Sequence, residues 1–312
     1  MNKTDKILVL GGNGLVGKAI IKKLISDRYT NVHMPNRDML DLTNNWDTIQ
    51  YFYKLRPQYI FLAAAKVGGI LANSKFPADF GHINGMIELN VLQAAYLSNR
   101  VQTNKLLFLG SSCIYPRDCP QPIKEEYLLS GYLEKTNELY ALAKILGLKL
   151  CEAYRKQNNC NFISCMPTNL YGPNDNFDLE TSHVLPALIR KVHEASIHKT
   201  KVEVWGDGSP MREFLYIDDL ADACVFLMKN YNSPETINIG TGIDITIKNL
   251  VETICDVVEF DHNNVVWDTL KPNGTPRKLL DVSKINNLGW KAQTDLITGI
   301  KKTYEWYKNS QS

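Results

Sequence analysis

The chain has 312 residues, of which 44% are hydrophobic and 22% charged, and its 35 basic and 33 acidic residues leave a formal net charge of +2. This composition is typical of a folded globular protein with one large domain or two joined domains, and it argues against disorder. The balanced charge argues against a nucleic-acid or membrane-surface partner.

The cysteines and the N-terminus favour a reducing compartment. The seven cysteines are scattered, with no C-x-x-C pair and no metal-like grouping, so we expect free thiols and no metal site. The N-terminus, MNKTDKILVLGG, lacks the features of a signal peptide, and no apolar stretch approaches the ~20 residues of a membrane span. We therefore expect a cytoplasmic protein without a membrane partner.

Short aliphatic runs alternate with longer amphipathic segments through the first half of the chain. Strands are predicted at 6–10, 31–34, 58–65, 105–110 and 161–166, with helices near 15–27, 45–55, 76–99 and 133–158. Such alternation is typical of a parallel sheet with helices on both faces. We therefore expect an α/β fold, with a Rossmann-type doubly wound sheet over residues 1–170.

The pattern changes after residue 170. Loops rich in Pro, Asn and Gly are followed by a predicted hairpin at 202–217, VEVWGDGSPMREFLYI. A helix near 218–230 and a strand at 236–240 are predicted to return to the first sheet. Residues 214–240 would thus belong to the first domain, and 171–213 with 241–312 would form a smaller C-terminal α/β domain for the substrate.

A glycine-rich turn follows the first predicted strand. In LVLGGNGLVGKAI, Gly11, Gly14 and Gly17 have the spacing G-x-x-G-x-x-G. Glycines there allow a sharp turn and a close approach of a pyrophosphate to the next helix N-terminus. The alternative is a tight turn without a ligand. Dinucleotide binding is therefore predicted for the whole turn, which comprises Gly11, Gly12, Asn13, Gly14, Leu15, Val16 and Gly17.

The segment after the second strand bears on the choice of dinucleotide. An acidic residue there favours NAD, whereas a basic one accommodates the 2′-phosphate of NADP. HMPNRDMLDL supplies Arg37, which favours NADP(H), although Asp38 beside it leaves a solvated Arg–Asp turn as an alternative. Asp41 and Leu42 are predicted to face the adenine.

Tyr140 and Lys144, in NELYALAKILGLKL, are the strongest catalytic signal. Four residues apart in a predicted helix, they lie on one face, so the ammonium is expected to lower the phenol pKa from its usual ~10 toward neutrality. Such a tyrosine passes a proton to a carbonyl oxygen as hydride arrives. Ser111, in GSSCIYP after the fourth predicted strand, would complete a carbonyl-polarising group. The spacing alone is common on surface helices, but its place after a dinucleotide turn favours catalysis.

Together these residues resemble the extended short-chain dehydrogenase/reductase family. Further segments narrow the resemblance to the GDP-L-fucose synthases, epimerase/reductases that convert GDP-4-keto-6-deoxy-mannose to GDP-L-fucose. The segments are AAAKVGGILANSKFPADF, KLLFLGSSCIYP, MPTNLYGPNDNF, SHVLPALIRKVHEA, WGDGSPMREFLYIDDLA and GTPRKLLDVSKINNLGW. The resemblance extends over nearly the whole chain.

The resemblance implies roles for the residues at matching positions. Contacts to NADP(H) would come from Leu109, Gly110, Ser111, Ser112, Tyr140, Lys144, Pro167, Thr168, Asn169, Leu170 and His183. Reduction at C4 would use Ser111, Tyr140 and Lys144, and proton exchange at C3 and C5 would use Cys113 and His183. Contacts to GDP would come from Lys191, Trp205, Arg212 and Asp281.

The two proton-exchange residues have plain alternatives. A thiol with a reference pKa of ~8.5 and an imidazole with ~6.5 suit exchange at carbons beside a ketone. Cys113 could instead fill a strand end, the role expected of the other six cysteines, and His183 could be a surface or capping residue. Trp205 and Arg212 flank the GDGSP turn, where the alternative is a core tryptophan and an exposed arginine.

The chain departs from the family pattern at two positions. Lys191 stands where some relatives have arginine, which keeps the charge but loses bidentate phosphate contact. Asn13 stands where some bacterial members have an arginine, so Arg37 would carry more of the contact to the NADP phosphate.

We therefore expect an NADPH-dependent reductase of a GDP-4-keto-6-deoxy sugar that also epimerises C3 and C5. One alternative is a C4 reductase without epimerisation, acting on a related sugar such as a heptose. Another is a cofactor-binding sensor without turnover. The resemblance also implies a homodimer built from the long helices near 76–99 and 133–158.

Overall fold

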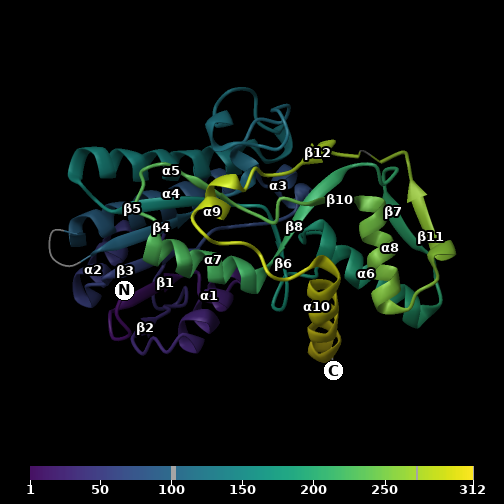
Figure 1. Cartoon of the computed structure of the whole chain (residues 1–312), viewed down its shortest axis with the longest axis horizontal. Coiled ribbons are helices and arrows are strands. Elements are labelled where there is room, and N and C mark those ends of the chain that lie inside the picture. Colours follow the sequence, from purple (N-terminus) through teal and green to yellow (C-terminus); the bar gives the residue numbers. More distant parts are fainter. Residues whose placement is uncertain (100–102, 272, 312) are drawn as a thin grey trace.

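A six-stranded parallel sheet forms the larger part of the molecule (Figure 1). The computed structural model describes residues 1–99, 103–271 and 273–311. The strand order is β2-β1-β3-β4-β5-β9, and every pair is parallel. The strands are β1 (Ile7–Leu10), β2 (Val32–His33), β3 (Tyr59–Leu62), β4 (Lys105–Leu109), β5 (Phe162–Pro167) and β9 (Ile237–Ile239). Runs such as KLLFL in β4 are buried throughout, as expected for strands covered on both faces.

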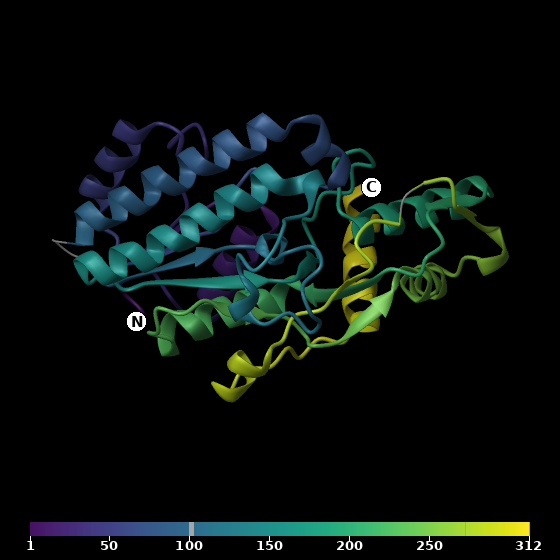
Figure 2. The same cartoon turned by 90° about the horizontal axis from the view of Figure 1, so that it is seen from above.

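Helices cover both faces of this sheet (Figure 2). One face carries α2 (Asn45–Leu55), α4 (Pro77–Asn99) and α5 (Glu138–Asn158), which pack side by side. The other face carries α1 (Leu15–Ser26) and α7 (Ile217–Asn230), which pack against each other. The predicted doubly wound α/β fold is therefore confirmed.

The rest of the chain builds two smaller sheets. In one, β8 (Met211–Tyr216) pairs antiparallel with β10 (Asp244–Thr246) and parallel with β6 (Asn169–Tyr171) and β12 (Arg277–Lys278). In the other, β7 (Val202–Trp205) pairs parallel with β11 (Val265–Asp268). The remaining helices are α3 (Ile70–Lys75), α6 (Val184–His198), α8 (Ile247–Val258), α9 (Ser283–Asn287) and α10 (Leu296–Gln311). Short 3₁₀ turns lie at Ser112–Ile114, Glu125–Tyr127, Lys135–Asn137 and His262–Asn264.

Two hydrophobic cores follow these sheets. The larger core lies around the six-stranded sheet, and the smaller one lies among α6, α8, α10 and the small sheets. β9 pairs with β5, as predicted for the strand at 236–240. Leu280, Ile285 and Trp290 pack in the larger core, although their segment was expected in the smaller domain. The domain boundaries therefore stay a prediction.

The predicted hairpin at 202–217 is wrong, because β7 and β8 take their partners from other parts of the chain. The turn between them contains Gly206 and Gly208, whose φ angles are +81° and +78°. The side chain of Asn273 accepts the N–H of Asp207 at 2.9 Å. A contact distant in sequence thus holds this turn and separates the two strands.

Two predicted helices have different limits in the structure. The helix expected near 76–99 is confirmed as α4, which begins one residue later, at Pro77, a residue that lacks an N–H. Phe76 before it has left the helical conformation, with φ −128° and ψ 48°. The helix expected at 133–158 begins only at Glu138, after a 3₁₀ turn.

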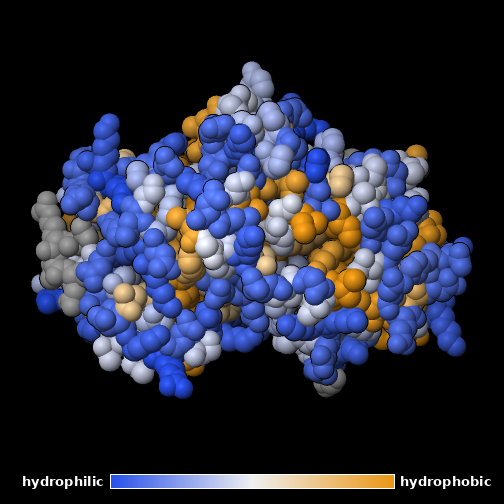
Figure 3. Space-filling view, viewed as in Figure 1, coloured by the Kyte–Doolittle hydropathy of each residue, from blue (hydrophilic) through white to orange (hydrophobic). Residues whose placement is uncertain are grey.

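The visible surface is mostly hydrophilic, as expected for a sequence with 22% charged residues (Figure 3). Hydrophilic residues predominate on the face seen in Figure 3, and hydrophobic residues gather toward its middle. Across the described ranges, no helix combines the length and the apolar character that crossing a membrane requires.

Candidate active site

The glycine turn lies where the order of the large sheet reverses. β1 is flanked by β2 on one side and β3 on the other, and open α/β sheets bind ligands at such a switch point. Gly11 has φ +85°, and a Cβ there would lie 2.7 Å from the backbone nitrogen of Ala64. A Cβ on Gly17 would lie 2.1 Å from the oxygen of Gly11. These two glycines are therefore required by the close packing of the turn.

The middle of the turn fits an anionic ligand. A Cβ on Gly14 would meet no protein atom closer than the Gly11 oxygen at 3.5 Å. Gly14 is the N-cap of α1, where no side chain caps the free N–H groups and the first turn holds no acidic residue. Leu15 and Val16 open that helix. Free N–H groups beside open space suit a pyrophosphate, so the dinucleotide fits this turn.

A surface pocket of about 330 Å³ lies at the end of β2, and Arg37 and Asp41 both line it. Thr43 donates to the Asp41 carboxylate from its N–H at 3.0 Å and from its hydroxyl at 2.7 Å. These bonds lower the pKa of Asp41, so this carboxylate anchors its own turn. Lys54 from α2 adds a second cation to the pocket, one that the sequence reasoning missed. The backbone carbonyl of Leu42 accepts a hydrogen bond from the side-chain amide of Asn90.

Ser111, Tyr140 and Lys144 come together at the carboxyl end of β4. The Lys144 ammonium is buried and donates to the Leu109 carbonyl at 3.1 Å. Ser111 and Tyr140 share a side-chain hydrogen bond. The N–H of Cys113 donates to the Ser111 hydroxyl at 3.2 Å. The predicted grouping of serine, tyrosine and lysine is thus present in the fold.

The expected lowering of the Tyr140 pKa is wrong for this structure. Burial raises the pKa of Tyr140 well above its usual value, with a smaller contribution from the negative charge of Glu88. The Lys144 ammonium forms an ion pair with Glu88 at 3.1 Å, which offsets its effect on the phenol. Glu88 lies on α4 and was not singled out from the sequence.

Cys113 differs from the other cysteines in its exposure. It is partly exposed, whereas Cys119, Cys151, Cys160, Cys165, Cys224 and Cys255 are buried. Cys113 lies on the 3₁₀ turn that packs against α5, the helix of Tyr140. Its electrostatic effect raises the pKa of both Tyr140 and Arg212, although burial lowers the pKa of Arg212 overall. The role of Cys113 in catalysis stays a prediction.

His183 is the N-cap of α6, and its side chain makes no capping hydrogen bond. Its ring is exposed, yet the surrounding protein lowers its pKa through loss of hydration. Gly69 donates its N–H to the carbonyl of Thr181, which brings the loop before α3 against the segment of His183.

The residues expected to contact GDP each contact a different part of the chain. Lys191 on α6 donates to the carbonyl of Glu203 at 3.0 Å. Trp205, at the end of β7, is 43% exposed, and the Lys271 ammonium lies 5.4 Å from its ring centroid. The Asp281 carboxylate accepts the N–H of Ser283 at 2.8 Å, next to α9. A common nucleotide site for these residues stays a prediction.

Glu213 links the two halves of the candidate site and was missed from the sequence. Its carboxylate is fully buried and accepts the N–H groups of Thr241 at 2.6 Å, Gly242 at 2.7 Å and Leu280 at 3.0 Å. Its carbonyl accepts from the side chains of Thr168 at 3.3 Å and Asn169 at 2.8 Å, within the segment Pro167–Leu170. The available signal in the sequence was an acidic residue directly before the apolar run FLYI.

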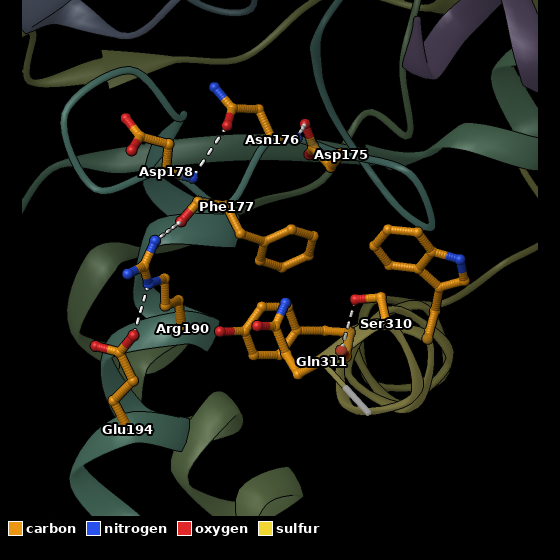
Figure 4. Close-up of a pocket in the computed structure, with 10 residues that line it drawn as sticks. Asp175, Asn176, Phe177, Asp178, Arg190, Glu194, Ser310 and Gln311 are labelled. Carbon is orange, nitrogen blue, oxygen red and sulfur yellow. Dashed lines mark hydrogen bonds and ion pairs between the residues drawn. The ribbon is translucent and has the colours of Figure 1, made fainter. Parts of the chain in front are cut away.

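A second surface pocket lies away from these residues (Figure 4). It has a volume of about 360 Å³ and lies between the 175–178 loop, α6 and α10. Its Arg190 donates to Glu194 at 2.7 Å and to the Phe177 carbonyl at 3.2 Å, so much of this guanidinium is already engaged. None of the site residues predicted from the sequence lines this pocket.

Comparisons with known proteins agree with this geometry. Residues 7–240 match the model of the NAD dependent epimerase/dehydratase family. The chain is 54% identical over 308 residues to putative GDP-L-fucose synthase 2 of Arabidopsis thaliana, covering 98% of this chain and 93% of the relative.

Two solved structures are similar over nearly their whole length. One is a GDP-L-fucose synthetase from Naegleria fowleri bound to NADP, with a TM-score of 0.90, 31% identity and coverage of 100% of this chain and 96% of that one. The other is a GDP-mannoheptose C4 reductase from Campylobacter jejuni with NADP bound, with a TM-score of 0.89, 38% identity and 99% coverage of both chains. The glycine turn, the serine–tyrosine–lysine group and these similarities place the chain in the NAD dependent epimerase/dehydratase family, among the GDP-L-fucose synthases.

Proposed function

We propose that this chain uses NADPH to reduce the C4 ketone of a GDP-4-keto-6-deoxy sugar and epimerises C3 and C5 beforehand, giving GDP-L-fucose. The observation that supports the proposal is the partly exposed Cys113, which lies on the 3₁₀ turn packed against the helix of Tyr140 and acts electrostatically on Tyr140 and Arg212. This arrangement offers a second proton-transfer group next to the reductase group and a cation for the nucleotide diphosphate.

The described residues would hold the cofactor at both of its ends. The glycine turn and the α1 N-terminus would hold the pyrophosphate, and Arg37 the 2′-phosphate. Leu109–Ser112, Pro167–Leu170, Lys144 and His183 would contact the nicotinamide half. When bound, NADPH supplies the hydride that the ketone carbon receives.

Tyr140 is the proton donor for C4. Because burial raises its pKa, the phenol holds its proton at neutral pH and has it available for the ketone oxygen. Its hydrogen bond to Ser111 orients the hydroxyl, and Ser111 supplies a second donor to the same oxygen. After the proton leaves, the ammonium of Lys144 stabilises the tyrosinate.

Cys113 and His183 account for the epimerisation. A C–H bond beside a ketone is acidic because the electron pair left on carbon delocalises into the carbonyl, where Tyr140 and Ser111 stabilise the oxygen. Inversion needs one group to remove a proton from one face and another to return a proton from the opposite face. A thiol and an imidazole, whose reference pKa values of ~8.5 and ~6.5 lie on either side of neutral pH, are the side-chain types that suit these roles.

The direct test is NADPH oxidation with GDP-4-keto-6-deoxy-D-mannose. Wild-type protein should turn over, and Tyr140→Phe should lower kcat about 10²–10⁴-fold, the usual contribution of a general acid. NADPH affinity, measured by fluorescence, should stay within about twofold because the phenyl ring is retained. Unchanged turnover in Tyr140→Phe would contradict the assigned proton donor.

A C4 reductase without epimerisation is the alternative that one comparison favours, since a similar structure is named a GDP-mannoheptose C4 reductase. Turnover of a GDP-4-keto-heptose but not of the hexose would establish it. A cofactor-binding sensor is the remaining alternative. NADPH binding without oxidation in the presence of either sugar would favour the sensor.

The proposal also includes that the protein forms a homodimer and is located in the cytoplasm. Leu139, Leu142 and Leu146 on α5 share one helix face and are each 42–46% exposed, as expected for a surface that a second copy covers. All seven cysteines are free thiols, which suits a reducing compartment. Light scattering should give twice the mass of one chain.

A further inference from the structure

Glu88 is a buried acid that has no role in the steps of the proposed reaction. It lies on α4 with 1% of its surface exposed, and its carboxylate is 3.1 Å from the Lys144 ammonium. A Cβ on Gly147, three residues after Lys144 on α5, would lie 2.5 Å from Glu88 Oε2 and 2.6 Å from the Phe108 ring. The absence of a side chain at Gly147 thus leaves the space that the carboxylate occupies.

A contribution to the stability of the fold does not by itself explain why the chain buries this ion pair. Taking both charges out of water is unfavourable, and replacing a buried ion pair by apolar residues is often neutral or stabilising. The cation of the pair is Lys144, whose second contact is the carbonyl of Leu109. Glu88 thus pairs with Lys144, the residue proposed to stabilise the tyrosinate of Tyr140.

The pair fixes both the place and the net charge of Lys144. The ion pair with Glu88 and the hydrogen bond to the carbonyl of Leu109 hold the ammonium at the carboxyl end of β4. The opposite charges cancel at a distance, so the phenol meets a nearly neutral pair instead of a bare cation. An isolated cation would pull the proton off the phenol before the ketone is bound.

We propose that Glu88 is a positioning residue that holds Lys144 in place and balances its charge, so that Tyr140 enters the reaction protonated, as a reduction requires. This inference rests on the proposed function, because it assigns a direction of proton transfer to the same site. Glu88 acts through Lys144 and touches neither reacting group.

The charged and titratable groups around the phenol come from several elements. Glu88 on α4 and Cys113 on the 3₁₀ turn after β4 act electrostatically on the phenol, and Lys144 lies one helical turn from Tyr140 on α5. Cys113 also acts on Arg212 of β8, and Glu88 acts on the buried Cys151 of α5. Burial and the charges of Cys113 and Glu88 raise the pKa of Tyr140, and the bond from Ser111 opposes them. Removal of Glu88 takes away one of the two negative groups.

The pH dependence of kcat for NADPH oxidation tests the proposal, with wild type and Glu88→Gln compared from about pH 6 to about pH 10. Loss of the carboxylate lowers the pKa of the phenol, which in wild type lies well above its usual value. In wild type kcat should therefore hold to the basic end of this range, whereas in Glu88→Gln a basic limb should move down into the range and lower kcat there by about tenfold for each pH unit. A lower kcat with an unmoved basic limb would overturn the proposal and leave Glu88 a structural residue.

Asp219 on α7 offers the matched control. Its buried carboxylate accepts the N–H groups of Gln293 at 3.2 Å and Thr294 at 2.8 Å, and α7 lies on the face of the large sheet opposite to α4 and α5 (Figure 2). Asp219→Asn removes a buried charge of the same kind and should leave the pH profile where it is. A shift as large as that of Glu88→Gln would also overturn the proposal.

Two further measurements separate this proposal from the proposed function. NADPH affinity should be several-fold lower in Glu88→Gln than in wild type, whatever the sugar substrate is, because Lys144 is proposed to contact the cofactor and has lost one of its two partners. Equal affinities in both proteins would contradict the role of Glu88. Glu88→Asp keeps the charge and should keep the basic limb within about half a unit, which gives a second variant should the glutamine fail to fold.

Discussion

The two sheets hold their parts of the site by different physical means. At the large sheet, close backbone packing fixes the loops, since Gly17 leaves no room for a Cβ beside Gly11. At the small sheet, the buried carboxylate of Glu213 holds the turn at Thr241 and the strand end at Leu280. The predicted cofactor half is thus defined by shape and the predicted substrate half by hydrogen bonds. Substitutions that add atoms should break the first half, and substitutions that remove acceptors should break the second.

Gly17→Ala should break the cofactor half most severely. The added methyl group would lie 2.1 Å from the Gly11 oxygen, and overpacking of this kind destabilises a fold by about 1–3 kcal/mol. We expect a lower thermal midpoint and an NADPH Kd raised about 100-fold, as a distorted phosphate turn implies.

Gly14→Ala is the matched control for that substitution. Its methyl group would meet no protein atom closer than 3.5 Å, so the thermal midpoint should be retained. NADPH affinity should still fall, because the methyl group occupies the space of the pyrophosphate. Equal thermal midpoints for Gly17→Ala and Gly14→Ala would refute the packing argument.

Glu213→Gln should break the substrate half by hydrogen bonding alone. The glutamine retains the size but offers one acceptor oxygen, so at least one of three backbone N–H groups loses its partner, at a cost of about 1–3 kcal/mol. GDP affinity, measured by calorimetry, should fall about tenfold or more. NADPH affinity should change little, because Thr168 and Asn169 bond to the Glu213 carbonyl, which the substitution retains. An equal loss of both affinities would remove the distinction between the halves.

Arg37→Ala should sharpen the description of the cofactor half. Arg37 is exposed and lines the pocket after β2, so its removal should leave the fold intact. Loss of a charge-assisted bond to the 2′-phosphate should weaken NADPH binding about tenfold, with NADH binding unchanged. Parallel losses for NADPH and NADH would show that Arg37 does not select the phosphate.

Lys105 provides a comparison at the opposite end of β4. Its buried ammonium donates to the carbonyls of Leu227 at 3.0 Å and Met228 at 2.9 Å, and burial lowers its pKa from 10.5 to about 8. Below about pH 8 the folded and unfolded chains both carry this charge. Between about 8 and 10.5 only the folded chain releases the proton, so this lysine makes stability rise with pH.

Lys105→Met should remove that rise. Across the window, the free energy of unfolding of wild type should gain about 3 kcal/mol relative to the variant, measured by urea titration at several pH values. Because Lys105 lies far from the site end of β4, kcat should be unaffected where both proteins are folded. Parallel stability curves for the two proteins would contradict the burial argument.

These contrasts also show what the sequence could predict. The glycine turn, the strands of the large sheet and the Tyr140–Lys144 pair follow from spacing within a few residues, and all were predicted in place. Glu88 and Glu213 were missed because their partners lie far along the chain, although Glu88 lies within the stretch MIELNVL and Glu213 directly precedes the apolar run FLYI. The hairpin prediction failed for the same reason, since Asn273 holds the turn from a distance.

The central claim is that one site both epimerises and reduces, with Cys113 as the added group. The most direct test is turnover of GDP-4-keto-6-deoxy-D-mannose with NADPH in D₂O, followed by NMR of the product. The wild-type product should be GDP-L-fucose carrying deuterium at C3 and C5. Cys113→Ser should lose that label while still oxidising NADPH, whereas a wild-type product reduced at C4 without deuterium would contradict the claim.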